Sequence, residues 1–201
     1  FLQDWGYEVV DLGFDSLDQI DEVDLVMVNV SDFGLDPGPD GFAAFEEAVN
    51  RARIPVLWLG QHGRGAIRFL HDYHGDPAVT GEGYNHGAVT ATVVSDHPLV
   101  AGLPEQFPPT APNQRYSYFD GFSGTTVATL ATENDGELGA TIAYRGRTAD
   151  TVDVLLSTLS ITTWGAPSTR EVPALHWTPE AERVLVNALA WALQAQGIGA
   201  H

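Results

Sequence analysis

A strand, helix, strand order in the first third of the chain constrains its fold most strongly. DLVMVNV (24–30) and IPVLWL (54–59) are short and almost wholly apolar, as expected of strands that helices cover on both faces. GFAAFEEAVNRA (41–52) lies between them and has helical spacing of its apolar residues. Because such crossovers are right-handed, the pattern predicts that 24–30 and 54–59 are adjacent or near-adjacent parallel strands. The apolar face of the helix consists of Phe42, Phe45, Ala48 and Val49.

Further segments extend this pattern into a single α/β domain over residues 1–201. YEVVDL (7–12) is rich in residues that favour strands, and AIRFLHDY (66–73) continues the chain as a helix. We therefore predict a flavodoxin-like three-layer sandwich with a mostly parallel sheet. Later segments follow one another without long helices, and we expect them to be edge or antiparallel strands added to this sheet. They are 88–94, 125–131, 140–145 and 151–159.

The final helix carries signals at both ends. Thr178 suits an N-cap, Pro179 suits the first helical position, and Gly197 suits the residue after the last turn. Before this helix, FPPTAP (107–112) is typical of a long rigid loop. The apolar stripe of the helix predicts its buried face, which is Val184, Leu185, Ala188, Leu189 and Leu193.

Charge and composition exclude several classes of function. The formal net charge is −18, and the nine basic residues are all arginine. A domain this acidic is repelled by nucleic acids, so we expect no nucleic-acid partner. No apolar run reaches the ~18–20 residues that span a bilayer, so we expect no membrane insertion. The chain has no cysteine, which excludes disulfides, thiolate metal ligands and cysteine nucleophiles.

The stretch PVLWLGQHGRGA (55–66) is typical of a buried strand that leads through a glycine-rich turn into a helix. Many α/β enzymes hold a nucleophile at such a turn, but here Gly60 stands at that position and has no side chain. Ligands favour the carboxyl ends of parallel strands, so Gln61, His62 and Arg64 are candidates for a polar pocket. Glycines that only permit a tight turn remain the alternative.

A second loop follows strand 24–30 and is predicted to lie at the same sheet edge. In SDFGLDPGPDG (31–41), Asp32, Asp36 and Asp40 resemble an oxygen-ligand loop, but their spacing does not fit a calcium motif. We take Asp32 as a candidate that faces the same pocket as Gln61, His62 and Arg64. Ordinary turn formation explains the loop equally well.

Three other segments combine polar and aromatic residues. GEGYNHG (81–87) is predicted to be a glycine-rich loop that carries Glu82 and His86. Such a loop can close over a binding site, or it can simply connect two elements. HDYH (71–74) places two histidines three residues apart, but without further ligands at recognisable spacing we expect no metal there. RYSYFDGF (115–122) is typical of a sugar-stacking surface, and a core strand edge or an interdomain contact explains it equally well.

Three stretches resemble a known family. PVLWLGQHGRGA is similar to the strand, elbow and helix of class I glutamine amidotransferase-like domains. SDHPLVAGLPEQF (95–107) resembles the histidine-proline and glycine-leucine segment of the trehalose-utilisation (ThuA-like) group, and TPEAERVLVNALAWAL (178–193) resembles its closing helix. Together these stretches span most of residues 24–193. The resemblance implies a strand and helix before GYEVVDL, so we expect this chain to be a piece of a longer protein that lacks its first strand.

This sequence departs from the family pattern at the residues that would hydrolyse glutamine. The resemblance places Gly60 where the cysteine nucleophile would stand, and His176 is not followed by the expected glutamate. We therefore expect no glutamine hydrolysis, no cofactor and no metal.

Three functions stay open at this point. The first is a non-catalytic accessory domain of a larger, exported protein that binds a sugar or small polar ligand or packs against neighbouring domains. The second is a carbohydrate hydrolase or isomerase that uses Asp32, His62, Glu82 or His86 as acid and base, and the third is an oligomerisation module. We favour the first, with an extracellular or cell-surface location over a cytoplasmic one.

Overall fold

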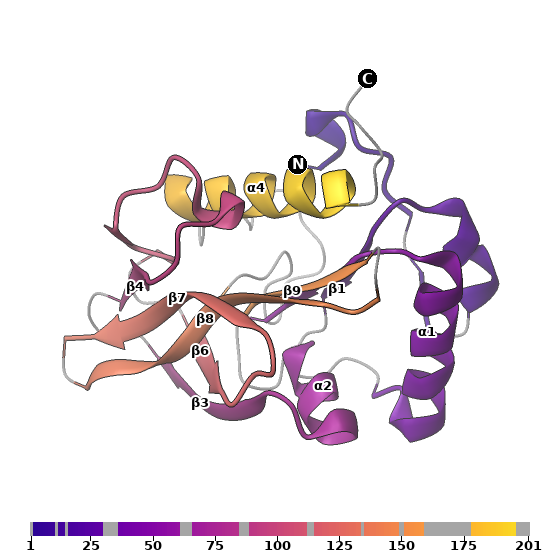
Figure 1. Ribbon diagram of the computed structural model, residues 1–201, viewed down its shortest axis with the longest axis horizontal. Helices are drawn as coiled ribbons and strands as arrows, with labels where there is room; N and C mark the ends of the chain where they lie inside the picture. The colour runs from indigo at the N-terminus through magenta and orange to yellow at the C-terminus, as the bar shows by residue number, and fades with distance from the viewer. Residues whose placement is uncertain are drawn as a thin grey trace.

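A computed structural model describes residues 2–10, 12–14, 16–29, 36–60, 66–84, 89–111, 115–133, 135–148, 151–158 and 178–195. Figure 1 shows its helices and strands. The helical elements are η1 (Gln3–Trp5), η2 (Leu17–Glu22), α1 (Gly38–Ala52), α2 (Ile67–His74), η3 (Pro98–Val100) and α4 (Pro179–Ala195). The strands are β1 (Val26–Asn29), β2 (Val56–Leu59), β3 (Ala78–Tyr84), β4 (Val89–Val93), β5 (Gln106–Phe107), β6 (Arg115–Asp120), β7 (Thr125–Thr132), β8 (Gly136–Gly146) and β9 (Val152–Leu156).

The parallel part of the sheet consists of β1, β2 and β9. β1 and β2 are parallel neighbours, with Val26 opposite Val56 and Asn29 opposite Leu59, so the prediction for segments 24–30 and 54–59 is confirmed. β9 lies on the other side of β2 and is parallel to it. We predicted that segment 151–159 is an edge strand or an antiparallel addition to the sheet. This is wrong on the side of β2, where β9 pairs in parallel, and right on the side of β8, where it pairs antiparallel. Its apolar run suits this interior position, because both of its faces are covered.

The rest of the sheet is antiparallel. The described order is β1-β2-β9-β8-β7-β4-β5, and β6 pairs with β3 and β8. Segments 88–94, 125–131 and 140–145 form β4, β7 and β8, as predicted for added antiparallel strands. The sheet is therefore mixed and consistent with a flavodoxin-like fold, but its parallel part is smaller than predicted. Among the described strands, only β1, β2 and β9 pair in parallel.

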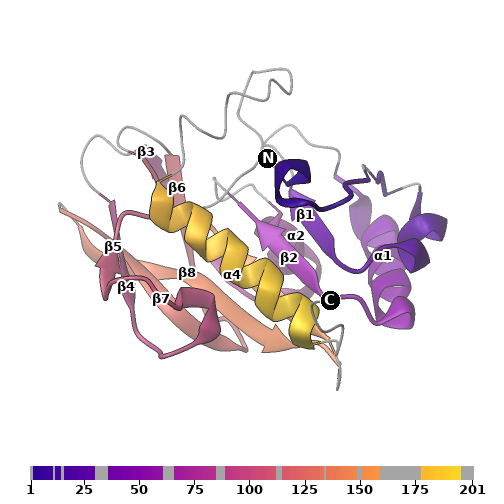
Figure 2. The ribbon, with the colours of Figure 1, turned by 90° about the horizontal axis from the view of Figure 1, so that it is seen from above.

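Helices cover both faces of the parallel strands (Figures 1 and 2). On one face, Leu57 and Leu59 of β2 pack in a cluster with α4 and η3. On the other face, Val56 and Trp58 pack in a cluster with α1 and α2. This alternation follows from the strand geometry, because successive side chains point to opposite faces. The two faces of each central strand therefore contribute to two separate parts of the core.

The helices match their predicted apolar faces closely. Phe42, Phe45, Ala48 and Val49 of α1 are all buried. In α4 the predicted stripe is buried as far as Leu189, while Leu193 is only half-buried and Ala192 is buried in its place. No helix in the described ranges is long and apolar enough to cross a membrane.

Two local predictions are wrong. The predicted strand YEVVDL is not formed over Tyr7–Val10, since no described strand pairs with these residues. All four of them are exposed. Residues 81–84 of the predicted loop GEGYNHG belong to β3 instead. The predicted rigid loop at 107–112 begins with a residue of β5, and residue 112 lies outside the described part.

Candidate functional site

The predicted pocket lies where β1 and β2 end. Asn29 and Leu59 are opposite each other in the parallel pair, so the segments that follow both strands leave the sheet at the same edge. Glu82 is in β3, and the position of its side chain is outside the described part of the structure. The other five predicted ligand-binding residues lie outside the described residues, and they are Asp32, Gln61, His62, Arg64 and His86.

Gly60 occupies the first position after β2. Its N–H donates to the carbonyl of Leu156 at 3.1 Å, which continues the pairing between β2 and β9 by one residue. The N–H of Ala66 donates to the carbonyl of Leu59 at 3.1 Å, and α2 begins at the next residue. The strand and the helix of the predicted elbow are therefore formed, with Gly60 directly after the strand, and residues 61–65 between them lie outside the described residues.

Asp36 of the predicted acidic loop has a structural role. Its Oδ1 accepts a hydrogen bond from the N–H of Gly38 at 2.9 Å and from the hydroxyl of Tyr73, and Arg68 lies 3.6 Å away. The Tyr73 hydroxyl and the Gly38 N–H hold the pKa of Asp36 below its usual value. Asp36 therefore ties the start of α1 to α2, as expected of a residue that forms a turn and a cap.

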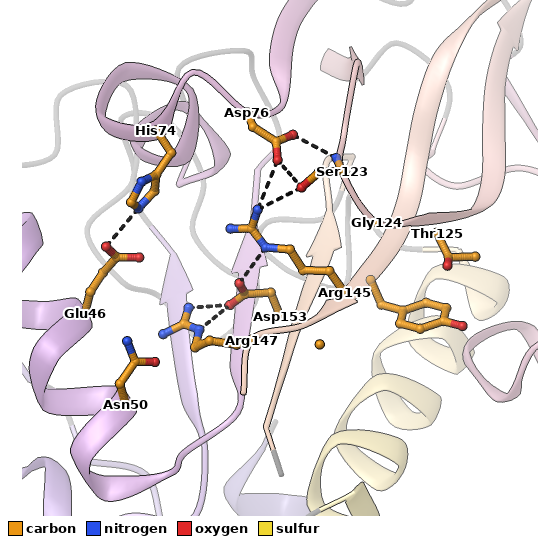
Figure 3. Close-up of a pocket in the computed structure, with 12 residues that line it drawn as sticks. Glu46, Asn50, His74, Asp76, Ser123, Gly124, Thr125, Arg145, Arg147 and Asp153 are labelled. Atoms are coloured by element: carbon orange, nitrogen blue, oxygen red, sulfur yellow. Dashed lines mark hydrogen bonds and ion pairs between the residues drawn. The ribbon is translucent and has the colours of Figure 1, made fainter. Parts of the chain in front are cut away.

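A polar cleft lies at the opposite, amino end of the parallel strands (Figure 3). Its volume is ≈ 770 Å³. Asp153 near the start of β9 is opposite Val56 at the start of β2, which places the cleft at this end. Its lining comes from α1, the end of α2, the start of β7, the end of β8 and the start of β9. The side chains drawn in Figure 3 include Glu46, Asn50, His74, Asp76, Ser123, Arg145, Arg147 and Asp153.

Asp153 is the centre of the cleft's charged network. Its side chain is 1% exposed and accepts a hydrogen bond from the indole Nε1 of Trp58 at 2.9 Å. Arg145 donates its Nε to Oδ2 at 3.1 Å, and Arg147 donates its Nε to Oδ1 at 3.0 Å and its Nη2 to the same oxygen. A buried carboxylate needs such partners, because an unpaired charge in the interior is very costly.

A second carboxylate extends this network to the loop before β7. Asp76 Oδ2 accepts a hydrogen bond from Arg145 Nη1 at 3.1 Å, and its Oδ1 accepts one from the Ser123 N–H at 3.0 Å. The Ser123 hydroxyl donates to Asp76 Oδ2. Arg145 also lies 5.3 Å from the centre of the Phe122 ring. Arg145 thus joins β8, β9 and two loops.

His74 at the end of α2 forms the wall of the cleft together with α1. Its Nε2 lies 2.8 Å from Glu46 Oε2, and its ring packs against Phe42 with centroids 5.3 Å apart. His71 of the predicted histidine pair is exposed. Across the described ranges, no group of three or more histidine, cysteine or acidic residues is arranged to hold a metal ion.

The aromatic segment 115–122 belongs to the core. Tyr116 and Phe119 of β6 are buried, and burial raises the pKa of the Tyr116 hydroxyl. Ser117 between them is also buried and donates to the carbonyl of Ser157 at 2.6 Å. The rings of Tyr116 and Phe119 are therefore core side chains and not available to stack on a sugar, whereas Tyr118 and Phe122 are half-buried.

The charged network of the amino-end cleft was not predicted from the sequence, and of its lining only His74 had been considered, as a metal ligand. One signal was present, since TVDVLL (151–156) places a single aspartate in an otherwise apolar strand. Such a residue needs a buried partner, and two of the nine arginines, Arg145 and Arg147, stand two residues apart shortly before it. The partners Asp76 and Ser123 carry no comparable signal.

Comparisons with known proteins support the fold. No family model matches the sequence, and no curated protein matches it. A solved structure from Thermoplasma acidophilum, described as a proposed component of GMP synthase, is similar with a TM-score of 0.59. The two chains are 13% identical, and the match covers 98% of this chain and 87% of that one. At this identity the likeness concerns the fold alone, and it shows that this chain shares the mixed α/β fold of that structure.

Proposed function

We propose that this chain is an amidotransferase-like domain that binds a small polar ligand and does not hydrolyse glutamine. Gly60 carries this proposal, because it directly follows β2, where such enzymes hold their nucleophile. Glycine supplies no attacking atom, and the chain has no cysteine to take its place. The scaffold in this proposal is a flavodoxin-like three-layer sandwich of the ThuA-like subtype. The helices on both faces of β2 support it.

The proposed ligand site lies beyond the carboxyl ends of β1 and β2. Ligands in α/β folds favour this edge, and the in-register pairing of Asn29 with Leu59 supports a shared site for the two segments that follow. Arginine, histidine and aspartate together suit hydroxyl-rich or anionic ligands, such as sugars and small acids. The residues proposed to bind are Asp32, Gln61, His62, Arg64, Glu82 and His86.

The proposed setting is a larger, exported multidomain protein at the cell surface or outside the cell. There the domain binds its ligand or packs against its neighbours as an accessory module. The resemblance to ThuA-like domains supports this setting, and Gly60 supports only the non-catalytic role of the module.

Calorimetry with a panel of sugars and small acids tests the proposal, alongside assays for glutamine and glycoside hydrolysis. We expect saturable binding without turnover. His62→Ala and Arg64→Ala should each weaken binding by roughly 1–3 kcal/mol, the cost of a lost buried hydrogen bond. Arg51→Ala is the matched control, because Arg51 and its partner Asp21 are both exposed and Arg51 stands in the last turn of α1, which leads to the start of β2 rather than to its carboxyl end.

Two results would overturn the proposal. Turnover that His62→Ala abolishes would show an enzyme. Binding that is unchanged in both the His62→Ala and the Arg64→Ala variant would place the ligand elsewhere.

A further inference from the structure

Arg147 is buried beside the amino-end cleft with part of its hydrogen-bonding capacity unused. Its side chain is 7% exposed. Its Nε and Nη2 donate to Asp153, while its Nη1 is buried and has no hydrogen-bond partner in the described part of the chain. In Figure 3 the free nitrogen points away from Asp153, toward the side of the cleft that Glu46 and Asn50 line. A buried N–H without a partner is costly, so an acceptor at this position would be stabilising.

From this geometry we propose a second ligand site, in the amino-end cleft, for a neutral hydroxyl-rich molecule of monosaccharide or cyclic-polyol size. Arg147 Nη1 donates to a ligand hydroxyl, and the side chains of Glu46 and Asn50 bind neighbouring hydroxyls. This site is separate from the one proposed beyond the carboxyl ends of β1 and β2. The two lie at opposite ends of the parallel strands.

The charged side chains that line the amino-end cleft nearly balance one another, which favours a neutral ligand over an anion. Two arginines, Arg145 and Arg147, face two carboxylates, Asp76 and Asp153, in one hydrogen-bonded network. Glu46 adds a further carboxylate, which is paired with His74. The lining is therefore neutral or singly negative, depending on the protonation of His74. An anion gains no net attraction from such a lining, and the chain's net charge of −18 repels it further.

The donors and acceptors of the cleft match hydroxyl groups. Arg147 Nη1 can only donate, a carboxylate such as Glu46 can only accept, and the Asn50 amide does both. A hydroxyl donates one hydrogen bond and accepts others, so adjacent hydroxyls on one ring satisfy all three side chains at once. The volume of ≈ 770 Å³ accommodates a molecule of this size.

The shape of the fold explains why this end of the sheet is open. α2 has eight residues and is therefore about 12 Å long. It ends where Gly75 adopts a left-handed conformation at φ 69°, and the Gly75 N–H donates to the His71 carbonyl at 2.7 Å. Its last residue, His74, lines the cleft, so the helix stops at the wall and leaves the side chains of Asp76 and Arg145 partly exposed, at 21% and 22%.

Ligand titration by NMR or calorimetry on the full chain tests this site. The probes are glucose, myo-inositol and glycerol, with acetate and inorganic phosphate as anionic comparators. We expect saturable binding of a ring polyol that is tighter than that of either anion. Asn50→Ala should weaken it about 5-fold, as for one lost neutral hydrogen bond. Arg147→Lys should weaken it about 10-fold, because lysine keeps the charge without the Nη1 donor.

Matched variants separate this site from the carboxyl-end site. Glu47→Ala should leave polyol binding unchanged, because Glu47 is exposed on α1 and does not line the cleft. The polyol titrations are repeated in a His62→Ala, Arg64→Ala double variant, which removes the proposed carboxyl-end site, so that the binding that remains, and its loss on adding Asn50→Ala, reports on the amino-end cleft alone and the two proposals fail independently. A thermal melt of each variant checks that it is folded.

Three outcomes overturn the inference. One is the lack of saturable polyol binding up to about 50 mM. The second is tighter binding of acetate or phosphate than of every polyol. The third is polyol binding that a folded Asn50→Ala variant retains in full.

Discussion

The indole Nε1 of Trp58 donates a hydrogen bond to the carboxylate of Asp153, with 2.9 Å between the two atoms. The two residues stand on the neighbouring parallel strands β2 and β9, and each is at most 1% exposed. The register sets Asp153 opposite Val56, so the indole reaches along the strand to the carboxylate. This contact fixes a buried negative charge at the amino end of the parallel strands.

Asp153→Asn should destabilise the protein by about 3–5 kcal/mol, because it leaves the buried Arg147 and the half-buried Arg145 without their shared counter-charge. Urea unfolding measures this loss. Asp21→Asn is the control, because Asp21 and its partner Arg51 are each 56% exposed, and exposed pairs contribute about 0–1 kcal/mol. A loss no greater than that of the control would contradict the role of Asp153.

Thr178→Ala should cost about 1 kcal/mol of stability. The Thr178 hydroxyl accepts the Ala181 N–H at 3.0 Å, as a helix N-cap does, and donates to the carbonyl of Pro108 at 2.7 Å. Denaturant unfolding of the Ala variant beside Thr178→Ser provides the measurement. Serine should retain most of the stability, since it keeps the hydroxyl. Equal losses in the two variants would show that the methyl group, not the cap, matters.

Stability should fall as the pH drops below 6.5 because of His97. Its ring stacks on Tyr144 with centroids 4.2 Å apart, and burial lowers its pKa. The unfolded chain then takes up the proton at a higher pH than the folded protein does. The stability contribution is therefore complete above the unfolded pKa of 6.5 and is lost as the pH falls toward the lower folded pKa.

Protonation of His97 would also remove an acceptor, because its Nδ1 accepts the Leu99 N–H at 3.3 Å. Urea unfolding between pH 5 and 8 should show this loss in the parent chain. The His97→Asn variant should show a smaller slope, since asparagine can accept the same bond without titrating there. Parallel pH profiles for the two proteins would refute the assignment.

One tyrosine should titrate at a pKa of about 12. The hydroxyl of Tyr73 donates to Asp36, which raises the Tyr73 pKa to about 12. The stability from this pair is complete below pH 10 and is lost as the pH rises through the folded pKa. Ultraviolet titration should lose the high-pH step in Tyr73→Phe and keep it in Tyr7→Phe, whose tyrosine is exposed. A step that survives in Tyr73→Phe would assign it to another residue.

His71 and His74 should hold no structural zinc. His74 is paired with Glu46, and no third ligand in the described ranges completes a site. Elemental analysis of the purified chain should give less than one tightly bound zinc per chain. Zinc at one equivalent that is lost in the double variant His71→Ala, His74→Ala would prove this prediction wrong.

The two ends of the parallel strands differ in how well a site there can be predicted from the sequence. The carboxyl-end site stays a prediction, drawn from two apolar runs and the residues after them, and the structure shows only that the two strands are parallel neighbours that end at one edge. The amino-end cleft could not be predicted in this way, since Arg145 and Asp76, which are hydrogen-bonded in it, are 69 positions apart in the sequence. Nothing in the local pattern of either residue indicates that partner.

The spacing of apolar residues along short stretches was enough to predict β1, β2 and the buried faces of α1 and α4. The place of β9 between β2 and β8, parallel to one and antiparallel to the other, could be found only in the folded structure. The same holds for Tyr7–Val10, which favour strands and yet lie outside the sheet. Strand pairing depends on the register between distant segments, and packing across the whole sheet sets that register, so no single segment contains it.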